Sequence, residues 1–315
     1  MHPAPSLVVF TTAAGAGYGL LFLLGVAAPF GFLPIERWFG VAALGLALGL
    51  ITIGLAASTY HLGHPERAWR ALSQWRSSWL SREGVAALVT YAVTAPFALG
   101  WVVWQTAGGA WAASALLTAI SAAATIACTG MIYASLKTIP QWYTPWVPAL
   151  FSAFALATGA IWLAALMHLF GVGAAWADWV AAGSLLLAWG LKVGYWRAMR
   201  RTAPASTAES ATGLGHLGRV QALEAPHTED NYLLREMGYR IARKHATRLR
   251  NLAVFFGLGW PLAFLALGQG GPSAADATRV LVAALAASLG VVMARWLFFA
   301  EAKHTVALYY GRHQD

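Results

Sequence analysis

Residues 58–85 read STYHLGHPERAWRALSQWRSSWLSREGV and lie between two long apolar segments. This stretch contains two histidines, two glutamates, four arginines and three tryptophans, whereas the flanking segments, 39–60 and 84–105, carry no charged residue. About 20 apolar residues are needed for a helix to cross the hydrocarbon core of a bilayer, and both flanking segments reach that length. The pattern therefore predicts two membrane-spanning helices joined by a polar loop that holds most of the groups able to do chemistry.

The composition of the whole sequence extends this prediction. Of the 315 residues, 59% are hydrophobic and only 10% are charged, which excludes a soluble protein. Sixteen tryptophans agree with a membrane protein, because amphipathic rings collect at both membrane interfaces. Cys128 is the single cysteine, so the chain has no disulfide framework and no thiolate metal or iron–sulfur site of its own.

Eight segments are apolar and long enough to span a bilayer. They are 6–28, 39–60, 84–105, 111–133, 148–170, 176–197, 249–268 and 278–300. Small residues recur in them, such as Gly15, Gly17 and Gly19 in the first, and allow close helix packing. We expect an all-α integral membrane protein: one polytopic domain over 1–315, whose eight helices could divide into two four-helix halves.

The distribution of basic residues predicts the orientation. If the N-terminus marks one side, the connections on that side and the C-terminal tail hold seventeen Lys and Arg, whereas the opposite side holds only Arg37 and Arg279. Lys192 and Arg295 fall inside spans. By the positive-inside rule we expect both termini and the 58–85 stretch to face the cytoplasm from an inner membrane.

Residues 198–248 form the one long hydrophilic connection. Its first part, 202–218, is rich in Ala, Ser, Thr and Gly and is expected to be irregular, and its second part, 229–250, is basic and compatible with a helix. Two interpretations stay open for this loop. It is either a solvated connector or a docking surface for a cytoplasmic partner.

His61 and Glu83 are the candidate reactive residues. His61 ends the second predicted helix and Glu83 begins the third, so both lie at one depth on the same side of the membrane. A histidine can bond a quinone oxygen and exchange one of the two protons that quinone chemistry requires, and a carboxylate can pass a proton to water. The alternative is structural: His61 caps a helix C-terminus, and Glu83 stabilises a first turn with Ser81 as the N-cap.

Further residues complete the candidate site. Residues 65–75 are predicted to form a short interfacial helix with Arg67 directed toward water or headgroups. For Arg82, the alternative to a role in the quinone site is a contact with a lipid headgroup. Arg295, inside an apolar span, costs roughly 2.5 to 3.5 kcal/mol on insertion scales, so it should face a partner or a polar cavity unless it snorkels to the interface. The full set of predicted quinone-contacting residues is His61, Glu83, Arg67, Arg82, Trp79, Tyr143 and Arg295.

Two other functional classes are weighed against a quinone site. A cytochrome-like subunit with haem b needs paired axial histidines at matched depth, whereas His61, His245 and His304 lie at helix ends. A transporter predicts charged residues in the middle of spans, and the uncharged run from Gly84 to Leu136 argues against it. The sequence therefore favours the quinone site over these two classes, and the capping alternative for His61 and Glu83 stays open.

Four features of the sequence resemble a known family. They are the eight-helix layout, YHLGHPERA at 60–68 with LSRE at 80–83, TIPQWYTPW at 138–146, and Arg295 near the end. Together they resemble the membrane-anchor subunits of dimethyl-sulfoxide-reductase-type molybdoenzymes. The resemblance implies a quinone-reactive subunit with no chemistry on the soluble substrate. It also implies two partners, a four-cluster iron–sulfur subunit and a molybdopterin catalytic subunit, and it places the quinone-site histidine and glutamate on His61 and Glu83.

The sequence departs from that family in orientation and in loop length. The matching face of the dimethyl sulfoxide reductase anchor looks toward the periplasm, whereas the count of basic residues predicts a cytoplasmic face here. The 198–248 loop also exceeds the corresponding connection. In both respects the chain is similar to the anchors of cytoplasmic membrane-bound sulfite dehydrogenases, which implies electron flow from sulfite to quinone; the alternative is an anchor that oxidises quinol.

Overall fold

The computed structural model describes residues 4–60, 62–172, 175–201, 206–221, 223–224, 245–268 and 273–305. Helices dominate these ranges. The long ones are α3 (Arg37–Tyr60), α4 (Trp79–Val102), α5 (Ala110–Ala134), α6 (Trp146–Leu169), α7 (Ala175–Arg201) and α13 (Ala274–Ala300). The first and seventh helices each contain a π-helical turn: α1 (Pro5–Val9), η1 (Phe10–Ala14) and α2 (Gly15–Ala27) are continuous, as are α11 (Ala246–Val254), η4 (Phe255–Gly259) and α12 (Trp260–Ala266).

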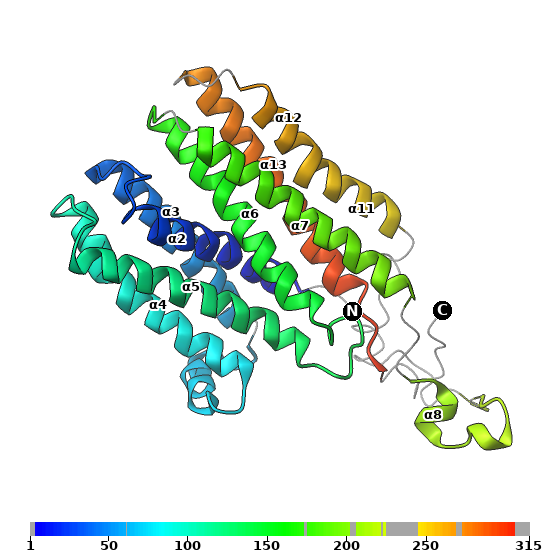
Figure 1. Cartoon of the computed structure of the whole chain (residues 1–315). Helices are drawn as coiled ribbons and strands as arrows, with labels where there is room; N and C mark the ends of the chain where they lie inside the picture. Colours follow the sequence, from blue (N-terminus) through cyan, green and yellow to red (C-terminus); the bar gives the residue numbers. More distant parts are fainter. Residues whose placement is uncertain are drawn as a thin grey trace.

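All eight predicted segments form helices, which confirms the all-α membrane fold. Seven of the described helices are both long and apolar enough to cross a membrane. The remaining long helix, α7, carries Asp178, Lys192 and Arg197 and is less apolar, but Figure 1 shows it alongside α6 in the same bundle. The boundary that differs most from the prediction is the start of α4, which lies at Trp79 and not at 84.

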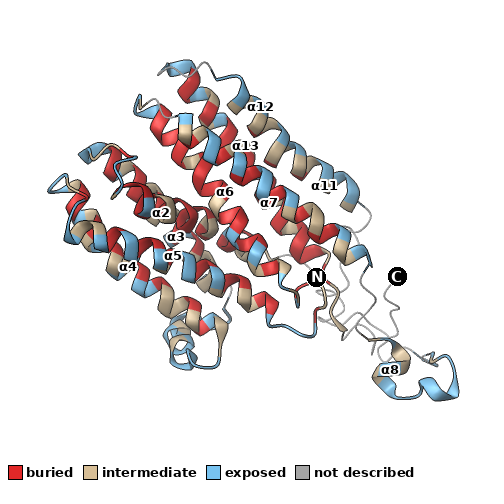
Figure 2. Cartoon of the chain, viewed as in Figure 1, coloured by how far each residue is buried: buried red, intermediate tan, exposed pale blue. Residues whose placement is uncertain are grey.

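The helix α6 lies at the centre of the bundle. In its most apolar window 83% of residues are buried, against 33% in α4 and 17% in the helix formed by α11, η4 and α12 (Figure 2). Figure 1 shows α4 and α5 on one side of α6, and α7, α13 and α11–α12 on the other. The helices α2 and α6 cross with their backbones almost touching: a Cβ atom at Gly19 would overlap the Ala155 carbonyl, and one at Gly159 would overlap the backbone of Gly19. Only glycine permits this approach.

Alternate helices begin at the same end of the bundle. We call one end the hairpin end, after residues 62–78, which join α3 to α4. The first helix, α4 and α6 begin at this end, and α3, α5 and α13 finish there (Figure 1). That hairpin contains η2 (Pro65–Gln74), a 3₁₀ helix where the sequence predicted a short interfacial helix. The other end, where α6 finishes and α13 begins, is the opposite end.

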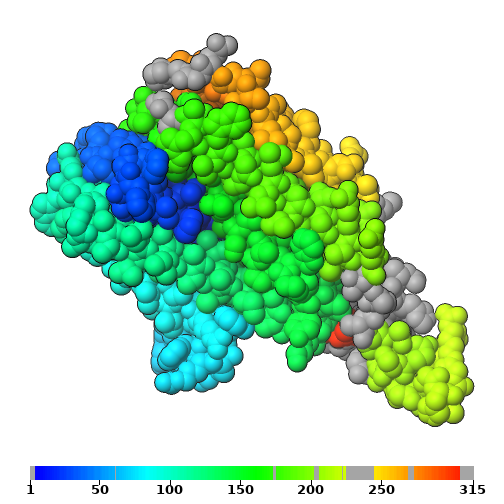
Figure 3. Space-filling model, in the orientation of Figure 1, coloured from blue at the N-terminus to red at the C-terminus, as the bar shows by residue number. Residues whose placement is uncertain are grey.

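The long connection after α7 is only partly described. Between 206 and 221 it forms a short helix, α8 (Ala208–Thr212), and a 3₁₀ turn, η3 (Gly215–Leu217), so the part expected to be irregular contains some helix. The predicted basic helix of 229–250 is described only from 245 onward, where α11 begins; 225–244 lie outside the described residues. In Figure 3 the described part of this connection and the hairpin stand out from the body of the molecule.

Candidate functional site

The N-terminus of α4 sets the position of Glu83. The side chain of Ser78 caps the helix by accepting a hydrogen bond from the Ser81 backbone N–H at 3.4 Å. Ser81, which the sequence predicted as the cap, instead donates from its hydroxyl to the Ala71 carbonyl and ties the hairpin to α4. Because the helix starts earlier than predicted, Glu83 lies in the second turn, and the first-turn stabilisation proposed as its structural role does not apply.

Glu83 is a buried carboxyl group between two apolar helices. Its residue is 4% exposed, and the hydroxyl of Thr129 on α5 donates a hydrogen bond to it. One helical turn from Thr129, the hydroxyl of Thr125 lies 3.2 Å from that of Thr90 on α4, so polar groups of α4 and α5 continue inward. An acidic side chain in an apolar bundle is costly, which makes it a functional candidate by default.

A narrow cavity lies on the other side of Thr129. Tyr18, Thr11, Thr129 and Arg295 supply its polar lining, and α2, α5, α6 and α13 contribute to its walls. The cavity volume is about 10 Å³, close to the space that one water needs. The hydroxyl of Tyr18 is buried and has no described hydrogen-bond partner, and Glu83 lies within electrostatic range of it. Thr129 and Tyr18 thus connect the cavity to the carboxyl group, the first by its hydrogen bond and the second by its electrostatic range.

Arg295 faces this cavity, as the sequence predicted. It is 6% exposed, so it does not snorkel to the interface, and its guanidinium carbon lies 3.5 Å from the ring centroid of Phe151. Its Nε atom is buried without a described partner. Glu301, at the C-terminal end of α13, pairs with Arg250 and not with Arg295, with 2.8 Å between Nη2 of Arg250 and Oε1 of Glu301.

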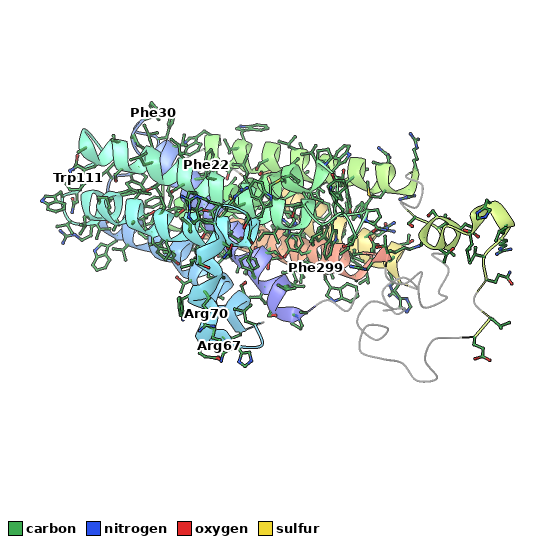
Figure 4. The ribbon with its side chains drawn as sticks, turned by 90° about the horizontal axis from the view of Figure 1, so that it is seen from below. Phe22, Phe30, Arg67, Arg70, Trp111 and Phe299 are labelled. Atoms are coloured by element: carbon green, nitrogen blue, oxygen red, sulfur yellow. The ribbon has the colours of Figure 1, made fainter. Side chains whose placement is uncertain are left out.

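Three of the predicted residues lie on or beside the hairpin. The guanidinium of Arg82 stacks 4.3 Å from the Trp79 ring centroid and donates to the carbonyls of Trp75 at 3.0 Å and Arg76 at 2.7 Å. The side chain of Arg67 is 58% exposed and lies 3.7 Å from Glu66. Figure 4 shows Arg67 on the segment that projects from the bundle. Arg82 and Trp79 therefore brace the base of the hairpin, and Arg67 is at its surface.

The two remaining predicted residues lie elsewhere. His61 is outside the described residues, but α3 ends beside it at Tyr60, at the hairpin end. Tyr143 is 52% exposed, in the loop between α5 and α6. The structure thus places the predicted set in three locations: Glu83 and Arg295 inside the bundle, Arg67, Arg82 and Trp79 at the hairpin, and Tyr143 on the α5–α6 loop.

The α5–α6 loop closes the bundle over Arg295. The indole of Trp142 donates to the Phe298 carbonyl at 3.2 Å, and the Gln141 carbonyl accepts from Tyr195 at 3.0 Å. The Gln141 side chain also accepts from the Lys303 backbone at 3.2 Å. These bonds give the 138–146 motif a structural role, since they hold the ends of α7 and α13 together.

Sequence reasoning missed two polar residues of the interior. Thr129 was not considered, although Thr118, Thr125 and Thr129 recur on one face of an otherwise apolar helix, which is a detectable signal. Tyr18 gave no signal, because a single tyrosine in a span is ordinary. Among the described residues no three His, Cys, Asp or Glu side chains lie close enough together to hold a metal ion.

The fold and this site define a class of protein: a multi-pass membrane protein with the buried charged groups Glu83, Lys192 and Arg295 in the half of the bundle that carries the hairpin. The chain belongs to the family of DMSO reductase anchor subunits (DmsC), whose family model matches residues 1–298. It is thus a membrane-anchor subunit of an oxidoreductase complex of the dimethyl sulfoxide reductase type, as the resemblance implied.

Two relatives show how far the similarity extends. A sulfite dehydrogenase subunit from Allochromatium vinosum is 31% identical over 329 residues, which is 98% of this chain and 99% of that protein. A subunit of the anaerobic dimethyl sulfoxide reductase of Escherichia coli is 30% identical over 146 residues, which is 45% of this chain and 50% of that protein. No solved structure matches the sequence.

Proposed function

We propose that this chain passes electrons between an iron–sulfur subunit and the membrane quinone pool, and that the quinone reacts at the hairpin end around His61 and Glu83. The observation that carries the proposal is the buried Glu83 carboxyl group, held by Thr129 about one turn inside the bundle. A buried carboxyl at this depth is close to both the apolar phase, where quinone resides, and the hairpin end.

The chemistry suits these residues. Reduction of a quinone to a quinol takes two electrons and two protons, and oxidation releases the same number. In our proposal, the electrons come from or go to the iron–sulfur subunit, and the carboxyl group of Glu83 and the imidazole of His61 each exchange one proton with a quinone oxygen. Thr129 orients the carboxyl group by its hydrogen bond.

The partner subunits are proposed to cover the hairpin end. Four clusters in the iron–sulfur subunit, with a molybdopterin catalytic subunit beyond it, follow from the family resemblance. The exposed arginines of the hairpin and the basic connection after α7 would supply the docking surface. Because basic residues concentrate on this side, we infer that it and both termini face the cytoplasm.

The direction of electron flow is proposed from the relatives. Similarity to the sulfite dehydrogenase protein extends over nearly the whole of both sequences, whereas similarity to the dimethyl sulfoxide reductase protein extends over about half. We therefore propose that sulfite is oxidised at the catalytic subunit and that its two electrons reduce quinone at this chain. An anchor that oxidises quinol is the alternative.

The test compares two variants in the assembled complex. In Glu83→Gln and His61→Ala, turnover with a quinone analogue should fall by roughly 10²-fold or more, the effect of losing a proton-transfer group, while electron transfer to an artificial dye continues. Glu36→Gln is the matched control, since Glu36 is exposed and lies beyond the opposite end. Unaltered quinone turnover in both test variants would refute the site.

A further inference from the structure

The helices α7 and α13 bury two positive charges that the proposed quinone chemistry does not use. Lys192 is 3% exposed and Arg295 is 6% exposed. Both side chains line one cavity, which the aromatic rings of Phe151, Phe154 and Phe298 help to enclose. Two cations side by side in an apolar bundle repel each other and lose their hydration, so this arrangement needs compensation.

The protein supplies little of that compensation. Within the described residues no carboxylate oxygen lies within 4.0 Å of either cation. The acidic group in electrostatic range of Lys192 is Glu301, and Arg250 already binds it at 2.8 Å. What surrounds the cations is aromatic: the Lys192 ammonium lies 4.9 Å from the Tyr195 ring centroid and 5.2 Å from that of Trp196. Cation–π contacts contribute about 0.5 to 2 kcal/mol each, less than the cost of a buried charge.

The cavity that these two cations share selects for a small occupant. Its volume open to the centre of a water-sized sphere is about 10 Å³, enough for one water-sized particle and too small for a quinone ring or an oxyanion such as sulfate. Apart from Lys192 and Arg295, its lining is entirely apolar: Val147, Leu150, Phe151, Phe154, Val291, Ala294 and Phe298.

The hydrogen-bonding chemistry distinguishes between a water and an anion. Ammonium and guanidinium groups only donate hydrogen bonds, and no acceptor side chain among the described residues lines the cavity. A water there would leave its own two hydrogens directed at apolar walls, whereas a monatomic anion only accepts. The Nε of Arg295, buried without a described partner, is one donor of the kind such an anion requires.

We propose that Lys192 and Arg295 form a binding site for a single halide ion, which in the cell is chloride. The ion balances the charge of the two cations and fixes α13 against α6 and α7 at the hairpin end. The proposed quinone chemistry does not use this site, although Arg295 also lines the cavity beside Thr129, and the role of the ion is independent of electron transfer.

Binding of radioactive chloride to the purified complex tests the proposal directly. In equilibrium dialysis against sodium gluconate, we expect one saturable chloride per copy of this chain, displaced by bromide and not by sulfate. Lys192→Met and Arg295→Met should each lose this binding. Lys137→Met, at an exposed lysine of the α5–α6 loop, should retain it.

A second measurement needs no variant. The Tm of the wild-type complex should rise by a few degrees when chloride replaces gluconate at constant ionic strength, because a ligand of the folded state stabilises it. In Lys192→Met the Tm should not depend on chloride. Absence of saturable chloride binding in the wild type would overturn the proposal and indicate a water in the cavity, and so would binding that persists in both methionine variants.

Discussion

Charged residues have different partners at the two ends of the bundle. At the opposite end, His168 lies 3.1 Å from both carboxylate oxygens of Asp178, and Arg279 lies 2.8 Å from Asp276 while also donating to the Phe264 carbonyl. At the hairpin end, Glu83 has a threonine as its hydrogen-bond donor, and Lys192 and Arg295 face aromatic rings.

The difference separates structural charges from functional ones. The paired groups join the ends of α6, α7, α12 and α13, and removal of either partner leaves a buried polar group without its partner. The three groups at the hairpin end, which have no ion-pair partner among the described residues, stabilise nothing by themselves, so their presence in an apolar bundle indicates ligands or reactions. Substitutions of the paired groups at the opposite end should therefore reduce stability directly, whereas substitution of Glu83 should reduce activity and substitution of Lys192 or Arg295 should remove ligand binding.

Asp178→Ala should have the largest effect on stability. It leaves His168, whose side chain is 6% exposed, without its partner, and should lower the free energy of unfolding by about 2 kcal/mol. The measurement is the Tm of the complex, with quinone turnover of the folded fraction expected to match the wild type. An unchanged Tm, or a loss of turnover with Tm intact, would contradict the division between the two ends. Glu36→Gln, at an exposed carboxylate on the same side, is the control.

Thr129→Val should reduce quinone turnover and not the Tm, the reverse of Asp178→Ala. The substitution keeps the side-chain shape and removes the hydroxyl that donates to Glu83, so quinone turnover should fall about tenfold, the equivalent of one hydrogen bond. Thr125→Val is the matched control, because Thr125 bonds the Ser121 carbonyl and Thr90 and not Glu83. Equal losses of turnover in the two variants would show that the effect comes from packing.

His304 should show the smallest effect, visible only as a dependence on pH. Burial lowers the pKa of His304 from its usual value near 6.5. At about pH 6.5 and below, the imidazole of the unfolded protein therefore binds a proton more readily than that of the folded protein. The free energy of unfolding decreases as the pH is lowered from about 6.5 to the folded-state pKa. In His304→Gln the Tm should decline less than in the wild type between about pH 7.5 and about pH 5.5. Parallel declines would rule out this contribution.

The sequence predicted the helices well because their cause is local. A bilayer requires every backbone polar group to be satisfied within the segment, so a run of about 20 apolar residues specifies a helix regardless of its neighbours. The start of α4 differed most from the prediction. Ser78 and Ser81 are equally good capping residues by type, and only the bond from Ser81 to the Ala71 carbonyl determines which of them serves as the cap.

The candidate site was predicted in part. Arg295 stood out because charge in an apolar span is expensive wherever it lies. Glu83 stood out as a carboxylate at the membrane edge, level with His61, and only the structure shows that it is buried. Arg82 and Trp79 were predicted because they lie in the polar 58–85 stretch. Their stacking, and the hydrogen bonds of Arg82 to two backbone carbonyls, depend on how the hairpin folds back on α4. The sequence separation of two residues does not by itself predict whether they contact each other across a turn.

The sequence by itself determined that this protein is a helical membrane anchor with its basic residues concentrated on one side, since hydrophobic length and charge distribution act residue by residue. Only the tertiary structure decided which polar groups meet. Lys192 and Arg295 are about a hundred positions apart, and they share a cavity because α7 and α13 both pack against α6. Thr129 reaches Glu83 because α4 and α5 pair along their length. Helix packing is set by the fit of side chains between helices, and a single helix carries no information about its partner's surface.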